Sequence, residues 1–246
     1  MNTATARLVR TELRLIARDP LVLIFALALP IVSMLIIGGS FGTRPNAGFS
    51  GADPAHWYVA SYLTVTIAAT GLVTVPVHLA TYREHGVLRR FAAAGFPRMS
   101  FGLAQLIVGL VTIAVAGALL LAIAAPVYGI PAMHVSWRVL VALGLGSVAF
   151  VSIGVLLGSV LPSARAAQAV GLLLFFPSFL LGAGGPPPHV MGAALRGVAR
   201  FLPLTVVTNA VREPWLGLGA ASVSLAALAG LTAATTLIAT RRAALS

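Results

Sequence analysis

The chain has no cysteine and no lysine, and it carries little charge of either sign. Without cysteine it forms no disulfide and offers no thiolate to a metal ion. Without lysine it cannot contain the GxxxxGK phosphate-binding loop, so it does not hydrolyse ATP through a standard P-loop. Only 9% of its 246 residues are charged, against about 25% in soluble domains. This is too little polar surface to cover a soluble globule.

Carboxylates are also missing from the interior of the apolar runs. All five acids lie outside these runs or at their ends, and the one histidine within a run is His78, near its end. Ion-coupled carriers usually need an ionisable group within the membrane. If the protein moves a cargo uphill, we expect the energy to come from another subunit. There is no HExxH or GxSxG motif and no metal-ligand spacing of histidines, so we predict no catalytic residue and no metal site.

What the sequence has in abundance is apolar residues, which make up 59% of it and give a mean hydropathy of +1.01. A helix needs roughly 20 apolar residues to cross a bilayer. We therefore predict an all-α integral membrane protein with six transmembrane helices in a single transmembrane domain over residues 1–246. The six predicted spans are residues 21–39, 59–80, 103–125, 139–161, 168–184 and 218–240.

Two amphipathic segments flank these spans. Residues 1–20 carry four arginines among apolar residues and predict a helix lying on the membrane surface rather than a cleaved signal peptide. Asp19-Pro20 then predicts the start of the first span. In the long connection 185–217, apolar residues recur at helical spacing after "GGPPPH". They predict a short outer helix, with an ordinary surface loop as the alternative.

Arginine counts predict the orientation. Eleven arginines lie on the side that holds both termini and the connection after the second span, and five lie on the other side. The positive-inside rule places the first side in the cytoplasm. Since the charge is confined to short segments between apolar runs, it predicts topology rather than nucleic-acid binding. The abundance of Ala, Gly, Val and Arg suggests a GC-rich bacterial genome. The expected location is therefore the bacterial cytoplasmic (inner) membrane, with both termini in the cytoplasm. Five aromatic residues predict an interfacial belt on the outer side: Trp57, Tyr58, Tyr128, Trp137 and Trp215.

The second span contains a row of polar residues, of which Thr66, Thr70 and Thr74 are the centre. One interpretation is that they line a pathway. The alternative is that their hydroxyls bond backbone carbonyls or a neighbouring helix. In the fourth span, Gly154 and Gly158 form a small-xxx-small pair that permits close helix contact.

The stretch "YREHGVLRRFAAAGFPRMSF" after the second span concentrates charge in an otherwise apolar chain. On a helical wheel over residues 82–95, apolar residues gather on one arc and arginines roughly opposite, and Pro97 ends the helix. This predicts an amphipathic cytoplasmic helix. The alternative is a positive-inside loop.

This stretch resembles the cytoplasmic helix after the second span of ABC-2 type transporter permeases, through Glu84, Gly86, Leu88, Phe91, Pro97 and Ser100. "FPSFLLGAGGPPPHVMGAALRGVARFLPLTVVTNAVRE" is similar to the fifth-span and outer-helix region of the family, with Pro203, Leu204, Thr205 and Arg212 at matching positions. The resemblance covers nearly the whole chain. It looks closest to the drug and antibiotic-resistance branch, similar to daunorubicin-type exporters.

The resemblance implies that the helix after span 2 couples the membrane subunit to a cytoplasmic ATPase, which would bind ATP and Mg. It also implies a second permease copy or paralogue, with a pathway between the two. The implied coupling residues are Arg83, Glu84, Gly86, Leu88, Arg89, Arg90 and Phe91. The pathway candidates are Thr66, Thr70, Thr74, Phe175, Phe176 and Phe179.

The expected function is export of an amphipathic drug, natural product or lipid, using ATP that a separate subunit hydrolyses. The alternatives are a self-contained passive channel or carrier and a membrane scaffold that transports nothing.

Overall fold

The computed structural model describes residues 3–93, 98–129 and 136–245. Within this part of the chain all regular structure is helical and no strand occurs. As predicted, six helical segments are long and apolar enough to cross a bilayer. Numbered in chain order, these spans are Pro20–Gly38, Ala47–Glu84, Gly102–Tyr128, Trp137–Val160, Ala164–Ala183 and Ser222–Arg242.

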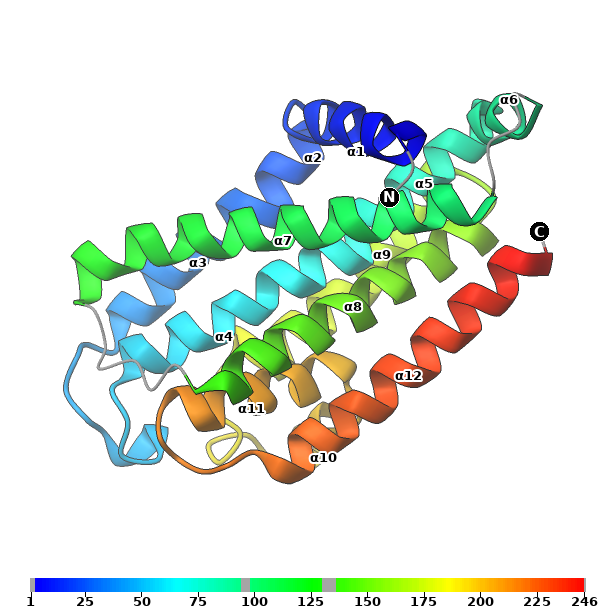
Figure 1. Ribbon diagram of the computed structural model, residues 1–246. Coiled ribbons are helices and arrows are strands. Elements are labelled where there is room, and N and C mark those ends of the chain that lie inside the picture. The colour runs from blue at the N-terminus through cyan, green and yellow to red at the C-terminus, as the bar shows by residue number, and fades with distance from the viewer. Residues whose placement is uncertain (1–2, 94–97, 130–135, 246) are drawn as a thin grey trace.

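The helices that build the spans run side by side in one bundle (Figure 1). They are α2 (Pro20–Val22) and α3 (Leu29–Ser33) in span 1, α4 (Pro54–Ala69) and α5 (Val75–Glu84) in span 2, α7 (Arg98–Tyr128), α8 (Trp137–Val160), α9 (Ala164–Ser178) and α12 (Ser222–Leu245). Four helices lie outside the spans: α1 (Thr3–Ile16), α6 (Val87–Ala93), α10 (Ala193–Phe201) and α11 (Pro203–Trp215). We name the two ends of the bundle after α6 and α10.

Span 2 is the centre of the bundle. In its most apolar window 89% of the residues are buried, against 17% in span 6. Spans 1, 3, 4 and 5 and helix α11 pack around it, whereas span 6 packs at the edge against span 4 and α11. The polar residues of span 2 therefore face other helices rather than lipid.

Capping residues decide where the spans begin. Asp19 and Asp53 each accept a hydrogen bond of 2.8 Å from a backbone N–H two residues on, and each is followed by proline at the first helical position. Span 2 therefore becomes α-helical at Pro54, before the predicted residue 59. Span 6 begins at Ser222 rather than 218, because the preceding Ala221 has a φ of +51° that a helix cannot contain.

Glycines let spans 4 and 5 approach the backbone of span 2. A Cβ atom on Gly154 would overlap the carbonyl oxygen of Gly71, and one on Gly171 would overlap the carbonyl oxygen of Leu72. A Cβ atom on Gly158 would also collide with span 2. The predicted close contact through Gly154 and Gly158 is thus confirmed, and its partner is span 2.

Spans 1, 2 and 5 differ from the others in their helical geometry. Each combines an internal proline, at Pro30, Pro76 and Pro177, with π-helical turns, whereas span 3 has a proline near its end, Pro126, without π-helical turns. The π-helical stretches are Leu23–Ala28, Met34–Gly38, Thr70–Thr74 and Phe179–Ala183. Spans 3, 4 and 6 are continuous α-helices. Because proline removes a backbone hydrogen bond and π-turns are frequent at functional sites, spans 1, 2 and 5 form the less regular part of the bundle.

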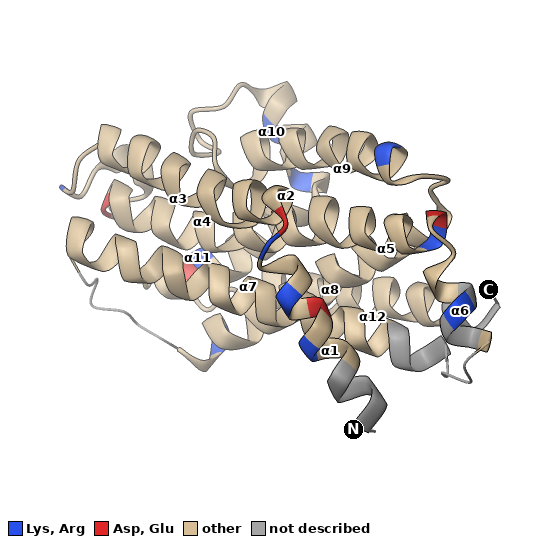
Figure 2. Cartoon of the chain, turned by 90° about the horizontal axis from the view of Figure 1, so that it is seen from above, with Lys and Arg blue, Asp and Glu red and all other residues tan. Residues whose placement is uncertain are grey.

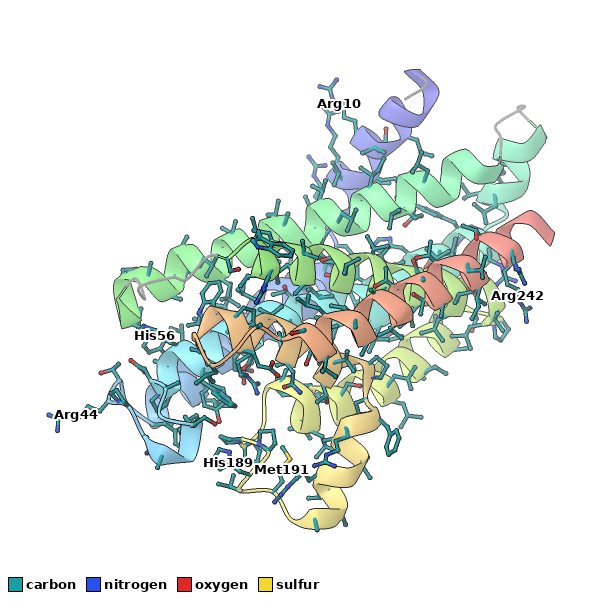
Figure 3. The ribbon with its side chains drawn as sticks, turned by 60° about the horizontal axis from the view of Figure 1, so that its bottom comes forward. Arg10, Arg44, His56, His189, Met191 and Arg242 are labelled. Atoms are coloured by element: carbon teal, nitrogen blue, oxygen red, sulfur yellow. The ribbon has the colours of Figure 1, made fainter. Side chains whose placement is uncertain are left out.

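The predicted surface helix is present as α1, which packs against span 3. Val9 and Ile16 are buried in a small apolar cluster with Val108 of span 3. Arg10 and Arg14 are exposed on the other face, and Figure 3 shows Arg10 pointing away from the bundle. The amphipathic segment therefore forms a helix, and its apolar face packs against span 3.

The single helix predicted over residues 82–95 is wrong, because these residues are divided between two helices, the end of α5 and α6. Helix α5 continues to Glu84, and Gly86 has a φ of +68°, the left-handed conformation with which glycine ends a helix. Helix α6 starts at Val87. Residues 94–97, including the predicted stop at Pro97, lie outside the described residues, as does the side chain of Ser100.

The connection between spans 5 and 6 holds one more helix than predicted. The expected outer helix is α10, but α11 follows it and packs into the bundle against α4, α8 and α12. Its buried residues Leu204, Val207 and Val211 recur at helical spacing, and Pro203 occupies the first helical position, where proline is favourable. This proline and this spacing could have predicted α11 from the sequence.

We predict that Gly154→Ala destabilises the protein while Gly144→Ala, on the same helix, does not. The methyl group at 154 would overlap the backbone of span 2, and overpacking of this kind costs about 1–3 kcal/mol. The methyl group at 144 would meet no atom within 4 Å. Both variants share the gain in helix propensity, so their difference isolates the steric cost. Thermal unfolding followed by tryptophan fluorescence measures it, and equal midpoints would contradict the packing.

Candidate functional site

The predicted ATPase-coupling residues divide at the turn between α5 and α6. Arg83, Glu84 and Gly86 precede α6, and Leu88, Arg89, Arg90 and Phe91 are part of it. On α6, Arg90 is exposed and Leu88 is half-buried. The side chains of Arg89 and Phe91 lie outside the described residues. Figure 2 shows basic residues on α6, at one end of the bundle, and on α1, along its side.

Arg83 binds the end of span 4. Its Nη1 atom donates to the carbonyl oxygens of Gly158 and Leu161, at 3.0 Å each. These carbonyls lie at the carboxyl end of α8, where the helix dipole is negative and the last carbonyls lack partners within the helix. The Arg83 guanidinium compensates the negative end of the dipole and donates hydrogen bonds to these carbonyls.

Glu84 binds the start of span 5. Its Oε2 atom accepts a hydrogen bond of 3.1 Å from the backbone N–H of Ala164, the first residue of α9. Ser163 caps the same helix by accepting from Ala166. A carboxylate at the positive end of a helix dipole is favourable. The Glu84 carboxylate therefore has its donor at a helix end.

Tyr82 binds the surface helix α1. Its hydroxyl donates to Oε2 of Glu12 at 2.8 Å, and Gln105 of span 3 lies buried beside the pair. Glu12 is only 3% exposed. Burial raises the pKa of Glu12 above its ordinary value of 4.5, and the hydrogen bond from Tyr82 offsets part of this rise. Glu12 lies three residues after Val9 and four before Ile16, so helical spacing places it on the buried face of α1.

A further polar contact joins spans 1 and 2 near the same end. Nε2 of His78 lies 3.2 Å from Oδ2 of Asp19, the residue that caps span 1. This distance is within the range of an ion pair, and Nε2 has no hydrogen-bond partner among the described residues. This contact explains the one histidine within an apolar run as a link between two spans.

The predicted pathway threonines are buried inside the bundle, where Thr66, Thr70 and Thr74 are at most 1% exposed. The Thr66 hydroxyl donates to the carbonyl of Leu63 at 2.7 Å. The hydroxyls of Thr70 and Thr74, in the π-helical turns, have no hydrogen-bond partner among the described residues. Buried hydroxyls of this kind are uncommon, and each is unfavourable for folding.

The predicted phenylalanines of span 5 lie in an aromatic row. Phe175 and Phe179 are buried and stacked at 5.7 Å, whereas Phe176 is 43% exposed on the flank of the span. Phe175 contacts Phe25 of span 1 at 6.3 Å, and Phe179 contacts Tyr62 of span 2 at 6.0 Å between ring centroids. The row joins the three irregular spans to one another.

The aromatic row continues toward the α10 end through Tyr62 and Tyr58, whose ring centroids are 6.2 Å apart. Their hydroxyls donate to the carbonyls of Gly184 and Gly185 at 3.4 and 3.3 Å. A Cβ atom on Gly184 would overlap the ring of Phe179. The two glycines of "GGPPPH" therefore allow the chain to turn tightly against the row.

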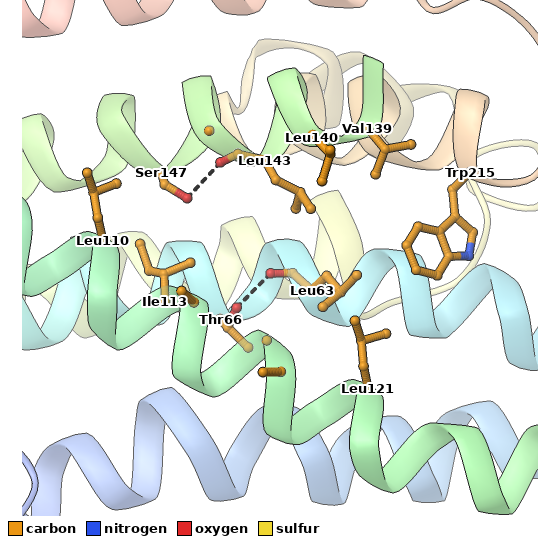
Figure 4. A pocket seen from close by; sticks show the side chains of 14 residues that line it. Leu63, Thr66, Leu110, Ile113, Leu121, Val139, Leu140, Leu143, Ser147 and Trp215 are labelled. Carbon is orange, nitrogen blue, oxygen red and sulfur yellow. Dashed lines mark hydrogen bonds between the residues drawn. The ribbon is translucent and has the colours of Figure 1, made fainter. Parts of the chain in front are cut away.

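A cavity of about 450 Å³ lies between spans 2, 3 and 4 (Figure 4). Thr66 is the one predicted pathway residue that lines it. The hydroxyls of Thr66 and Ser147 both donate to carbonyls of their own helices, so the lining presents no free polar group from either. Trp215 of α11 closes one side. The cavity suits an apolar group.

Arg212, a residue of the second quoted motif, is buried in α11. Its Nε and Nη2 atoms donate to Oγ of Ser61 at 3.1 and 2.7 Å, and its guanidinium lies 4.1 Å from the ring centroid of Trp57. Ser61 in turn donates to the carbonyl of Trp57. These contacts fasten α11 to span 2.

The predicted aromatic belt is only partly right. Trp57 and Tyr58 of span 2 and Trp215 of α11 are at most 5% exposed. All three belong to the apolar core of the bundle, which is why they do not lie at the membrane interface. Trp137 is 66% exposed at the start of span 4. A position near the end of a predicted span therefore does not tell whether an aromatic side chain is buried or exposed.

We predict that Arg212→Ala lowers the free energy of unfolding by about 2–4 kcal/mol, because it removes a buried cation–π contact and two charged hydrogen bonds. Arg138 also stacks on a tryptophan, at 5.6 Å, but this tryptophan is exposed. Arg138→Ala is the matched control, with an expected loss below about 1 kcal/mol. Denaturant unfolding measures both, and equal losses would contradict the role of burial.

We predict that Glu12→Gln stabilises the protein at neutral pH and not at acidic pH. The folded state binds the Glu12 proton more tightly than the unfolded chain does, so wild-type stability is lost as the pH rises from 4.5 through the raised pKa. Glutamine keeps an acceptor for Tyr82 without the charge. Unfolding midpoints between about pH 4 and pH 8 test this, with Glu213→Gln as the control. A constant difference across the range would contradict it.

None of the curated proteins matches the chain. The family described as ABC-2 type transporter matches it over residues 3–215, from α1 through span 5 to the end of α11. Members of this membrane permease family lack an ATPase domain of their own, which agrees with the absence of lysine from the sequence. The chain belongs to the ABC-2 type transporter family.

Proposed function

We propose that the chain is the membrane subunit of an exporter that moves an amphipathic or hydrophobic molecule, with ATP hydrolysed by a separate cytoplasmic ATPase subunit. The observation that carries this proposal is the family match across the membrane domain combined with an exposed basic helix, α6, directly after the most buried span. Any ATP and Mg would be bound by the partner.

Helix α6 is the proposed contact with the ATPase. It is short, it carries Arg89 and Arg90, and it is held at the end of the bundle by Arg83 and Glu84. A basic surface orients the docking of an acidic partner surface and raises the rate of association. The proposed contact residues are Leu88, Arg89, Arg90 and Phe91, with Gly86 setting the direction of the helix.

The proposed cargo pathway lies along spans 1, 2 and 5, at the interface with a second permease copy or paralogue. The support for it is that the π-helical turns and the aromatic row through Phe175 and Phe179 lie in these three spans. Phe176 is exposed on the flank of span 5, where a second copy could pack. Thr66, Thr70 and Thr74 would contribute to the pathway if the spans separate.

The cargo is proposed to be a drug, natural product or lipid. The lining candidates are aromatic or hydroxyl-bearing, and none of the five acids lies in the middle of a span. Such surroundings favour apolar molecules with few polar groups. A passive channel or a scaffold is the competing function, and neither of them needs an ATPase.

We propose that the α6 end of the bundle faces the cytoplasm of a bacterial cell. The support is the excess of arginines there, which the positive-inside rule assigns to the cytoplasmic side. Arg10 and Arg242 lie toward this end, whereas Arg44 lies at the far end of the molecule (Figure 3).

We predict that an ABC ATPase co-purifies with the chain from native membranes and that Arg89→Glu/Arg90→Glu abolishes its association, because it reverses the charge of the docking helix. Arg44→Glu, an exposed charge reversal on the opposite side, should leave the association intact. Quantitative mass spectrometry of the purified complex measures this. A well-folded wild-type protein without any ATPase would favour the channel or scaffold function.

We predict that Thr70→Val and Thr74→Val each keep or raise stability while lowering ATP-dependent transport. Valine has nearly the shape of threonine, and it removes a buried hydroxyl that has no partner among the described residues. The control is Thr64→Val, since the Thr64 hydroxyl is bonded to Thr208 and its loss should cost stability. Unchanged transport in the Thr70 and Thr74 variants would remove these residues from the pathway.

A further inference from the structure

We propose that Tyr82, Arg83 and Glu84 form a hub that transmits movement of α6 to three other parts of the protein: the surface helix α1, span 4 and span 5. The inference rests on the proposed function, since it needs an ATPase that moves α6. It assigns these residues to transmission within the membrane subunit rather than to contact with the ATPase.

The hub consists of three consecutive residues with three different partners. Tyr82 donates to Glu12 of α1, Arg83 donates to the last carbonyls of span 4, and Glu84 accepts from the first N–H of span 5. Successive side chains of an α-helix point about 100° apart, so three in a row reach three sides of the helix. All three are the last residues of span 2.

The hub is joined to α6 by a turn that is hydrogen-bonded on both sides. The Gly86 N–H donates to the Arg83 carbonyl at 3.1 Å, and the Gly86 carbonyl accepts from the Arg90 N–H at 3.2 Å. Only His85 and Gly86 separate the two helices. A force on α6 therefore reaches the hub through a short connection with its own hydrogen bonds.

The charges of the hub match the helix ends that they bind. Arg83 lies at the negative end of α8, and Glu84 lies at the positive end of α9. The two helix ends are connected by only three residues, 161–163. The pair Arg83-Glu84 therefore holds both sides of this connection, with Arg83 passing a displacement of the end of span 2 to span 4 and Glu84 passing it to span 5.

Deeper in the bundle, the glycine contacts continue the same linkage. Span 4 packs against the backbone of span 2 through Gly154 and Gly158, and span 5 does so through Gly171. Span 4 also packs against span 6 and α11. A movement that enters at the hub is thus passed to spans on both sides of span 2.

The absence of cysteine from the chain allows a direct test. A single cysteine replaces Val160 at the end of span 4 or Arg165 near the start of span 5, both of them exposed. It is labelled with an environment-sensitive fluorophore in a complex whose ATPase has no reactive cysteine. The change in emission on addition of ATP and Mg is then measured in nanodiscs.

Removal of one hub contact should reduce mainly the fluorescence change of the span that this contact holds. Arg83→Ala should remove most of the ATP-dependent change at position 160 and less of that at 165, and Glu84→Ala should do the reverse. Arg83→Lys and Glu84→Gln, which keep a donor and an acceptor, should restore part of each signal. His85→Ala is the matched control and should change neither signal. Among the described residues, the hydrogen bond of the His85 ring is to the Thr81 carbonyl of its own helix.

The hub proposal is overturned if the complex assembles and hydrolyses ATP but both alanine variants keep wild-type signals, or lose both signals equally. Co-purification of the ATPase and the elution profile of each variant separate these results from misfolding. If no ATPase assembles with the wild-type chain, the proposed function itself fails.

Discussion

The close approach of neighbouring backbones to span 2 is the constraint on which the rest of the structure depends. Spans 4 and 5 contact its backbone at positions where any side chain larger than glycine would overlap, at Gly154, Gly158 and Gly171. Span 2 is enclosed as a result. Its polar side chains bond carbonyls of their own helix or groups of neighbouring helices, and the hydroxyls of Thr70 and Thr74 have no partner among the described residues. It also carries α6 at its end. The helix that we propose to contact the ATPase is therefore attached to the most enclosed element of the bundle.

The bundle combines a regular part with an irregular part. Spans 3, 4 and 6 are continuous α-helices, whereas spans 1, 2 and 5 contain prolines and π-turns and share the aromatic row. Because proline and π-turns leave backbone groups without their usual partners, we expect these spans to change conformation at lower cost than a regular helix. Our account assigns cargo movement to the irregular part and support to the regular part.

Much of this arrangement could be predicted from the sequence, because long apolar runs and charge distribution act locally. The six spans, α1 and the close contact through Gly154 and Gly158 followed from such patterns. Other features depend on packing between distant segments. Arg212 covers Trp57, and Tyr82 covers Glu12. Arg83 and Glu84 bind the ends of spans 4 and 5. Each of these contacts joins residues far apart in the chain. The break at Gly86 was visible as a glycine, but only its backbone conformation showed that it ends the helix.

The central claim is that α6 is the contact between this chain and its ATPase. The most direct measurement places a photoactivatable cross-linker on Ala93→Cys, the exposed last residue of α6 and the only thiol of the chain, in native membranes. Our account predicts a cross-link to the nucleotide-binding subunit of an ABC ATPase, whose yield changes with ATP. A cross-linker on Arg44→Cys should give no such product. Cross-links from Ala93→Cys to lipid or to unrelated proteins only, with the ATPase absent, would contradict the account.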